Sequence, residues 1–280
     1  MLIGILSVQF GAGAAKTLFD EVSPTGLVWL RLASSSIVLL LIARPRLRGR
    51  DRIDWLTVLG FGLSLGLMNW AFYQSFSRIP IGIAVTIEFI GPLSVAVFGS
   101  RRRRDLAWVG LAAAGVLLLG AERTDLDPVG VAFALLAGAL WAAYILLSAR
   151  TGQRWEGLDG LAVARALAVL LLTPTLVGTE RGPLDDPRIL AFGAAVGLLS
   201  SVIPYSCELV ALRRLRPAQF GVLMSLEPGA AALAGLLVVG ERLSVVQMLA
   251  IGCVVVASVG ATRSASSTAL AEPSSPPPLG

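Results

Sequence analysis

The feature that most constrains this chain is its alternation of long apolar stretches with short polar breaks. About 20 helical residues span a bilayer, and backbone amides that find no water in lipid must bond within a helix. Charged residues make up only 15% of the 280, far below a soluble domain of this size. The sequence therefore predicts an all-α polytopic membrane protein with ten transmembrane helices: Leu2–Phe19, Val22–Ala43, Trp55–Phe76, Ile79–Gly99, Leu106–Ala121, Val129–Ala149, Leu158–Gly178, Ile189–Leu212, Ala218–Val239 and Leu243–Thr262.

The second feature is an internal repeat of about half the chain. Basic residues within or beside apolar stretches recur 134 positions apart, as Lys16 with Arg150 and as Arg31 with Arg165. A pair of prolines, Pro92 and Pro228, keeps nearly the same offset. A duplicated apolar chain of this kind predicts a membrane transporter built from two inverted five-helix repeats, residues 1–123 and 128–262. Chance matching of arginines near helix ends is the alternative.

Arginines are distributed unevenly between alternate loops. One set of loops holds Arg44, Arg46, Arg48, Arg50, Arg52, Arg101 to Arg104, Arg150, Arg154, Arg213, Arg214, Arg216 and Arg263, and the other holds Arg78, Arg123, Arg181, Arg188 and Arg242. The positive-inside rule then predicts that both termini are cytoplasmic. Because a short basic loop at a helix end serves topology, no nucleic-acid partner is expected from the Arg101–Arg104 run. Residues 263–280 are Ser/Pro-rich and are expected to be disordered, and no cleavable signal peptide is expected at the start.

Six ionisable residues fall inside the predicted spans: Lys16, Arg31, Glu88, Arg165, Glu208 and Glu227. Each isolated charge at a helix centre costs about 2.5–3.5 kcal/mol, so each should face a partner or water. Equal depth in the membrane suggests two pairs, Arg31 with Glu88 and Arg165 with Glu227. Such pairs are compatible with a substrate site and equally with simple clamping of helices.

Prolines follow the polar positions closely. Pro92 removes the amide that would bond the carbonyl of Glu88, Pro204 does the same for Ser200, and Pro228 for Met224. Freed carbonyls in a membrane are tolerated where they line a cavity or are covered by protein. Broken helices with polar groups near the midplane predict a substrate site there.

Aromatic and amide side chains supply further candidates. Trp70 with Tyr73, and Trp141 with Tyr144, are three residues apart and therefore share a helix face. They line a pocket or pack in the core, and Asn69 bonds either a zwitterionic ligand or a neighbouring helix. The chain has no histidine, which excludes a Ser/His triad and an HExxH zinc site. We therefore expect no enzyme, no cofactor and no metal, and transport driven by an ion gradient.

Several stretches resemble the drug/metabolite transporter superfamily of EamA-domain proteins, and within it the bacterial inner-membrane exporters of threonine and homoserine. The stretches run from Ser7 to Lys16, from Gly66 to Tyr73, from Gly82 to Pro92, from Pro204 to Glu208 and from Phe220 to Pro228; Ile-Ala-x-x-x-Glu-Phe-x-Gly-Pro is the most discriminating of their motifs. The resemblance covers both repeats and departs at a shorter N-terminus and at the Ser/Pro-rich tail. It implies an inner-membrane exporter of small hydrophilic amino acids that works by proton antiport and alternating access. Efflux of another polar metabolite or a cationic drug is the alternative, and the oligomeric state stays open.

Proton antiport requires a group that binds and releases a proton, and without histidine the candidates are glutamates. Glu88 is the first candidate, because it lies near the midplane, where a substrate ammonium could displace Arg31. Glu227 is the second. Glu208, near the basic Arg213 and Arg214, is expected to stabilise the closed inner face.

Overall fold

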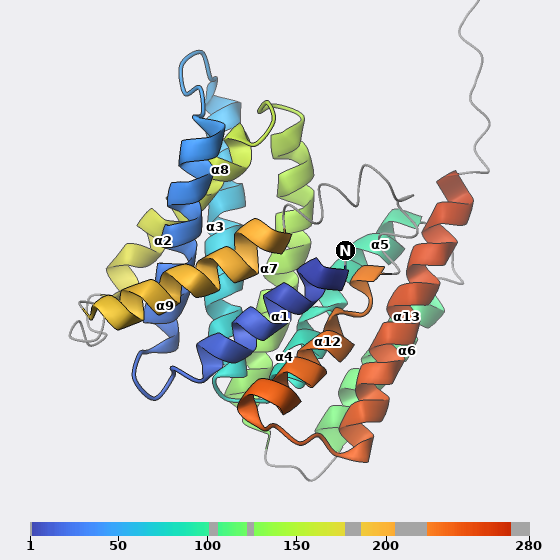
Figure 1. Cartoon of the computed structure of the whole chain (residues 1–280). Coiled ribbons are helices and arrows are strands. Elements are labelled where there is room, and N and C mark those ends of the chain that lie inside the picture. Colours follow the sequence, from blue (N-terminus) through green and yellow to red (C-terminus); the bar gives the residue numbers. More distant parts are fainter. Residues whose placement is uncertain (1, 101–105, 122–125, 177–185, 205–222, 270–280) are drawn as a thin grey trace, which may run out of the picture.

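The computed structural model describes residues 2–100, 106–121, 126–176, 186–204 and 223–269, drawn in colour in Figure 1. Every regular element within these ranges is helical, so the predicted all-α class is confirmed for the described part of the chain. Glu208 lies outside the described residues.

Each of the ten predicted spans overlaps a helical segment of the described residues, and that all ten cross the membrane stays a prediction. Five segments are long and apolar enough to cross a membrane: α2 (Pro24–Ala43), α3 (Arg52–Phe76), α7 (Pro128–Gly152), α8 (Asp159–Leu172) with its 3₁₀ extension η2 (Thr173–Leu176), and α13 (Val245–Ala269). Shorter apolar helices occupy the other five predicted spans: α1 (Leu2–Lys16), α4 (Ile81–Glu88) with α5 (Ile90–Ser100), α6 (Leu106–Ala121), α9 (Pro187–Gly197) with the π-helical turn η4 (Leu198–Val202), and α12 (Glu227–Ala234) with the π-helical turn η5 (Gly235–Val239). That the two halves are inverted repeats stays a prediction.

Local sequence explains where the long helices begin. Ser23 accepts a hydrogen bond from Gly26 N at 3.1 Å, and Pro24 follows at the first helical position. Asp127 and Asp186 also precede prolines and cap α7 and α9. A side-chain oxygen accepts a hydrogen bond from an amide that has no partner within the helix. Proline at the first helical position costs no hydrogen bond, because an amide there would have no partner within the helix.

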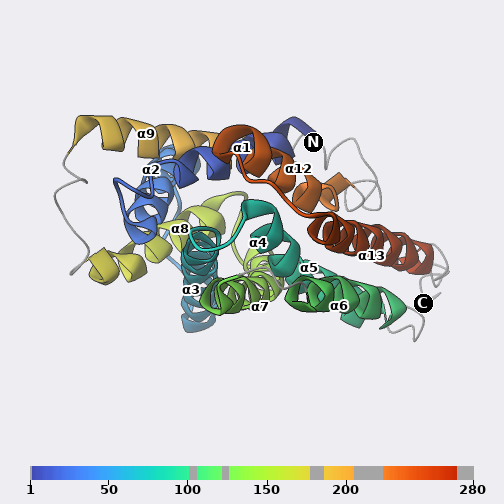
Figure 2. The same ribbon diagram turned by 90° about the horizontal axis from the view of Figure 1, so that it is seen from below.

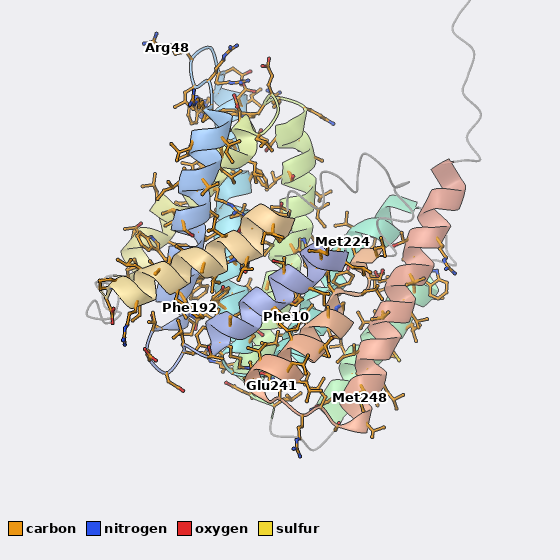
Figure 3. All side chains as sticks on the ribbon, viewed as in Figure 1. Phe10, Arg48, Phe192, Met224, Glu241 and Met248 are labelled. Atoms are coloured by element: carbon orange, nitrogen blue, oxygen red, sulfur yellow. The ribbon has the colours of Figure 1, made fainter. Side chains whose placement is uncertain are left out.

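The helices form two layers when viewed along the bundle. Figure 2 shows α9, α1 and α12 along one side and α3, α7 and α6 along the other, with α8 and α4 between them. Contacts of α1 with α9 and α12, and of α3 with α7 and α8, agree with this arrangement. Figure 3 places Arg48 and Glu241 at opposite ends of the bundle.

The Glu241 end of the bundle is filled by large buried side chains. Tyr73 and Phe76 of α3 are fully buried, and the Phe19 ring packs against both, with centroids 6.1 and 5.2 Å away. Ile79 and Ile81 continue this cluster toward α4. Aromatic and branched side chains at this density leave little room for water.

The last helix corrects one prediction. The sequence places the end of the tenth span at Thr262 and disorder from residue 263 onward, whereas α13 continues to Ala269. The sequence from 263 to 269 contains no proline or glycine that would break a helix. The helix therefore continues beyond the end of the apolar segment at Thr262. Residues 270–280 lie outside the described part of the chain.

Candidate functional site

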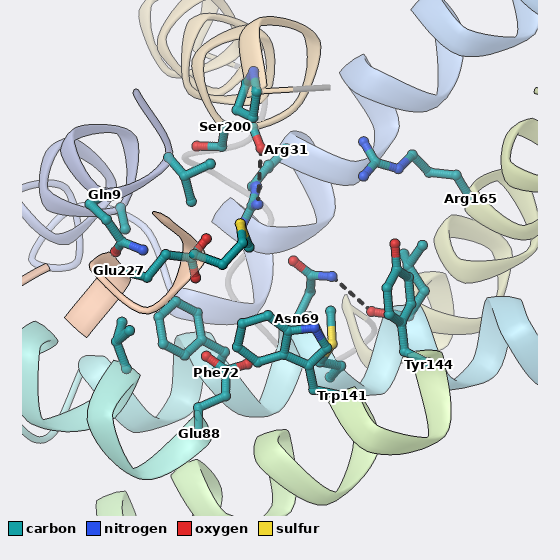
Figure 4. A pocket seen from close by; sticks show the side chains of 17 residues that line it. Gln9, Arg31, Asn69, Phe72, Glu88, Trp141, Tyr144, Arg165, Ser200 and Glu227 are labelled. Carbon is teal, nitrogen blue, oxygen red and sulfur yellow. Dashed lines mark hydrogen bonds between the residues drawn. The ribbon is translucent and has the colours of Figure 1, made fainter. Parts of the chain in front are cut away.

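A cavity of about 260 Å³ lies between the two layers of helices. Figure 4 shows it from close by, with side chains reaching it from both layers. It is lined by Val8, Gln9, Ala12, Arg31, Leu65, Met68, Asn69, Phe72, Val85, Glu88, Trp141, Tyr144, Arg165, Ser200, Pro204, Met224 and Glu227. Drug-sized ligands occupy pockets of about 300–1,000 Å³, so this cavity suits a smaller solute.

Four of the six charges that the sequence places inside spans meet at this cavity. Arg31 comes from α2, Arg165 from α8, Glu88 from α4 and Glu227 from α12. Glu88, Glu227 and Arg165 are only 7%, 8% and 4% exposed. Two basic and two acidic side chains therefore surround one cavity, and three of the four are buried.

Helix interruptions position the two glutamates. Helix α4 ends at Glu88, and α5 begins two residues later at Ile90, close to Pro92. Helix α12 begins at Glu227, with Pro228 in its first turn. The predicted interruptions beside Pro92 and Pro228 are therefore confirmed, and each glutamate stands at a helix end that borders the cavity.

Glycines bring the Glu88 segment against α7. A Cβ on Gly138 would lie 2.8 Å from the Glu88 carbonyl oxygen, and a Cβ on Gly91 would overlap the Gly138 carbonyl. The carbonyl that Pro92 leaves without an amide thus faces α7, and the absence of side chains at both glycines permits the approach. Protein covers this carbonyl, as the sequence argument requires of a break in a membrane helix.

Arg31 makes contacts other than the predicted one. Its Nη2 donates to the Ser200 carbonyl at 3.4 Å, and its guanidinium lies over the Tyr73 ring, 5.7 Å from the centroid. The Ser200 carbonyl is the one that Pro204 leaves without its helical amide, so the break supplies the acceptor.

The predicted Arg31–Glu88 ion pair is wrong for this conformation. Neither Arg31 nor Glu88 takes part in an ion pair within 4.0 Å among the described residues. Equal depth puts two side chains at one level of the membrane, but the helix crossings decide which of them touch. In Figure 4 the side chains of Arg165 and Glu227 approach the cavity from different sides, and their pairing stays a prediction.

Three uncharged candidates line the cavity. Asn69 donates through Nδ2 to the Leu65 carbonyl at 2.8 Å, so part of its bonding capacity is used within α3. Trp141 stands edge-on to Phe89 with centroids 5.5 Å apart, and Tyr144 packs on Phe61 at 5.2 Å. Packing of this kind fixes the orientation of both rings at the cavity wall.

Two predicted site residues lie elsewhere. Tyr73 is fully buried in the aromatic cluster, and its ring packs against the Arg31 guanidinium. Lys16, at the end of α1, forms a 2.6 Å ion pair with Glu241 and donates to the Ile79 carbonyl at 2.8 Å. Lys16 thus joins helix ends outside the cavity and does not line it.

Sequence reasoning missed Gln9 at the cavity and Glu241 at the end of the bundle, and it named Ser200 only for the carbonyl that Pro204 frees, not for its hydroxyl. Gln9 and Ser200 are polar residues inside predicted spans, which is the signal that could have found them. Glu241 lies between two predicted spans, and nothing in the sequence pairs it with a lysine about 225 residues earlier.

An apolar helical bundle whose interrupted helices hold buried charges around a central cavity defines a membrane transporter. The chain belongs to the EamA-like transporter family, whose model matches residues 1–121 and again residues 128–263.

Its relatives include amino-acid exporters. The chain is 43% identical to the threonine/homoserine exporter RhtA of Salmonella typhimurium and 42% identical to RhtA of Escherichia coli K12, in each case over 94% of this chain and 90% of the relative. It is also 26% identical to the uncharacterized inner membrane transporter YedA of Escherichia coli K12, over 84% of this chain and 80% of YedA. A solved crystal structure superposes with a TM-score of 0.61 at 20% identity, covering 96% of both chains, and supports the fold alone.

Proposed function

We propose that this protein is an inner-membrane secondary transporter that exports small hydrophilic amino acids of the threonine and homoserine type. The observation that carries the proposal is the set of four ionisable side chains, two basic and two acidic, around one small cavity; Arg165, Glu88 and Glu227 are buried and Arg31 is partly buried. A zwitterion offers a carboxylate to an arginine and an ammonium to a glutamate, so it satisfies charges that are costly to bury alone. The RhtA relatives, which are threonine/homoserine exporters, support the same substrate class.

Arg31 is the residue we assign to the substrate carboxylate. The Ser200 carbonyl and the Tyr73 ring hold its guanidinium at the cavity without neutralising it. A guanidinium with a neutral hydrogen-bond partner retains its attraction for a carboxylate, which it can bind through two parallel N–H groups. Arg165, from the other side of the cavity, completes the cationic part of the site.

Glu88 is the residue we assign to the proton, with Glu227 second. Glu88 lies at the cavity, is buried, and forms no ion pair among the described residues. A carboxyl group in this position must be neutralised by a proton or by a cation that enters the cavity. Competition between a proton and a substrate ammonium for the same carboxylate is the minimal requirement for proton antiport with alternating access.

The second interpretation is that the two glutamates serve as counter-ions for a cationic drug that the protein exports. The two arginines that line the same cavity oppose it, because a monovalent cation would approach positive charge without neutralising it. The cavity of about 260 Å³ also favours a small solute over a drug-sized one.

Reconstitution tests the proposal directly. Proteoliposomes that contain the protein should exchange labelled threonine for internal threonine, and an imposed pH gradient should drive net accumulation above the level without a gradient. A panel that includes lysine and a lipophilic cation separates the two readings. Uptake of the cations with no uptake of threonine would refute amino-acid export.

A further inference from the structure

We infer that Gln9 and Ser200 form a subsite for the side-chain hydroxyl of the transported amino acid and so set a preference for hydroxy amino acids. The inference rests on the proposed function and deepens it. It assigns two uncharged residues that come from different helical segments and line the same side of the cavity.

Burial without partners is the first observation. Gln9 is 3% exposed and Ser200 is 5% exposed, and both line the cavity. Gln9 Oε1 and Ser200 Oγ are buried, and neither atom has a hydrogen-bond partner in the part of the chain that the structure describes. Buried polar atoms are nearly always bonded, and an exception at a cavity wall points to a ligand that completes the bonding.

The crossing of α1 and η4 is the second observation. Ser7 Oγ donates to the Leu199 carbonyl at 2.6 Å, and the Ser200 hydroxyl occupies the space where a Cβ of Gly11 would stand. Gly11 therefore lets η4 approach α1, the helix that carries Gln9, closely. In Figure 4 the Gln9 and Ser200 side chains lie on the same side of the cavity.

Ser200 links this subsite to the charged part of the site. Its carbonyl accepts from Arg31 Nη2 at 3.4 Å, whereas its hydroxyl oxygen has no partner among the described residues. A substrate whose carboxylate is held by Arg31 would thus have its side chain within reach of the same residue. Val8 and Ala12, which also line the cavity, provide apolar contact for the carbon atoms of that side chain.

The bonding capacities match a hydroxyl group. A substrate hydroxyl donates its one proton to Gln9 Oε1 and accepts the proton of the Ser200 hydroxyl. A substrate with hydrogen or methyl in that place leaves both protein atoms unpaired in a buried site. Sites built to bond a substrate hydroxyl reject the analogue without it strongly for this reason.

Transport competition in wild-type proteoliposomes is the first test and needs no variant. Unlabelled threonine and homoserine should inhibit uptake of labelled threonine at concentrations at least about tenfold lower than 2-aminobutyrate or valine, as expected when a missing hydroxyl leaves buried groups unpaired. Equal inhibition by threonine and 2-aminobutyrate would overturn the subsite while leaving amino-acid export intact. Failure to take up threonine at all would instead overturn the proposed function.

Substitution is the second test. Gln9→Met and Ser200→Ala should each lower the ratio of threonine to 2-aminobutyrate transport, at protein levels in the liposomes matched to wild type. Ser201→Ala is the matched control, because Ser201 is an equally buried neighbour whose hydroxyl is also unpartnered among the described residues but does not line the cavity. The control should keep the wild-type ratio. A fall in both rates at constant ratio in the Gln9 and Ser200 variants would show a structural role and refute the assignment.

Discussion

Lys16 and Glu241 form a close ion pair, with Nζ and Oε1 2.6 Å apart. The other carboxylate oxygen of Glu241 accepts from the backbone amide of Ile81 at 2.9 Å, and Lys16 donates to the Ile79 carbonyl at 2.8 Å. One pair of side chains therefore ties the end of α1, the start of α4 and the segment between η5 and α13. These contacts lie beyond the aromatic cluster, at the Glu241 end of the bundle (Figure 3).

Removing one member of this pair should destabilise the protein. The side chains are only 16% and 12% exposed, so Lys16→Met leaves a largely buried carboxylate without its cation, at a cost of about 3 kcal/mol. The double variant with Glu241→Gln should lose less than the two single variants together, measured by thermal unfolding in detergent.

Asp127→Asn is the matched control for that measurement, because it removes the ion pair with Arg78 and keeps a side-chain oxygen to cap α7. Arg78 and Asp127 form a longer pair, 3.7 Å apart, between more exposed side chains, and such pairs contribute about 0–1 kcal/mol. Additive losses at Lys16 and Glu241 would show that the two residues do not stabilise each other.

Glu88→Gln should abolish gradient-driven transport in a folded, inserted protein. The amide is nearly the same size as the carboxyl group but cannot exchange a proton at physiological pH. Accumulation of threonine under a pH gradient should fall to the level without a gradient, as measured in proteoliposomes. Accumulation at the wild-type rate would rule out Glu88 as the proton-binding group.

Gly138→Ala should lower stability and transport together. The added methyl group would lie 2.8 Å from the Glu88 carbonyl oxygen, and forcing extra carbon into a filled contact costs about 1–3 kcal/mol. Gly252→Ala on α13 is the control, because a Cβ there meets nothing within 4 Å. Unfolding temperatures that fall equally in both variants would contradict a specific contact at Gly138.

A reporter enzyme that is active only in the periplasm should be silent when fused to the C-terminus. The prediction follows from the arginine-rich loops, of which the one carrying the exposed Arg48 lies at the end of the bundle opposite Glu241. A fusion within the segment between η5 and α13 should be active in the same assay. Activity from the C-terminal fusion of an intact protein would reverse the orientation.

The helical segments and their interruptions could be predicted because both depend on local sequence. Apolar runs locate the helices, and Pro92 and Pro228 locate the breaks beside Glu88 and Glu227. Burial cost also predicted that charges inside spans would gather, and four of them line one cavity. These inferences need only the neighbours of each residue along the chain.

Contacts between distant helices could not be predicted in the same way. Arg31 contacts Ser200 and Tyr73 in place of Glu88, and Lys16 contacts Glu241, because tilt and close approach of helices decide which side chains meet. Close approach depends in turn on small residues such as Gly11, whose missing side chain admits Ser200. Burial cost singles out charged residues in the sequence before neutral ones, so the side chains of Gln9 and Ser200 were not predicted as part of the site.

The close crossing of α5 and α7 positions Glu88 independently of the residues that we assign to the choice of substrate. Glu88 is held in place by backbone against backbone at Gly91 and Gly138, with no side chain between them. Residues such as Gln9 and Ser200 take no part in that crossing, so they can be exchanged without displacing the carboxylate. Descendants of such a chain can therefore acquire new solutes by substitution at the cavity wall while inheriting the charge-handling residue unchanged.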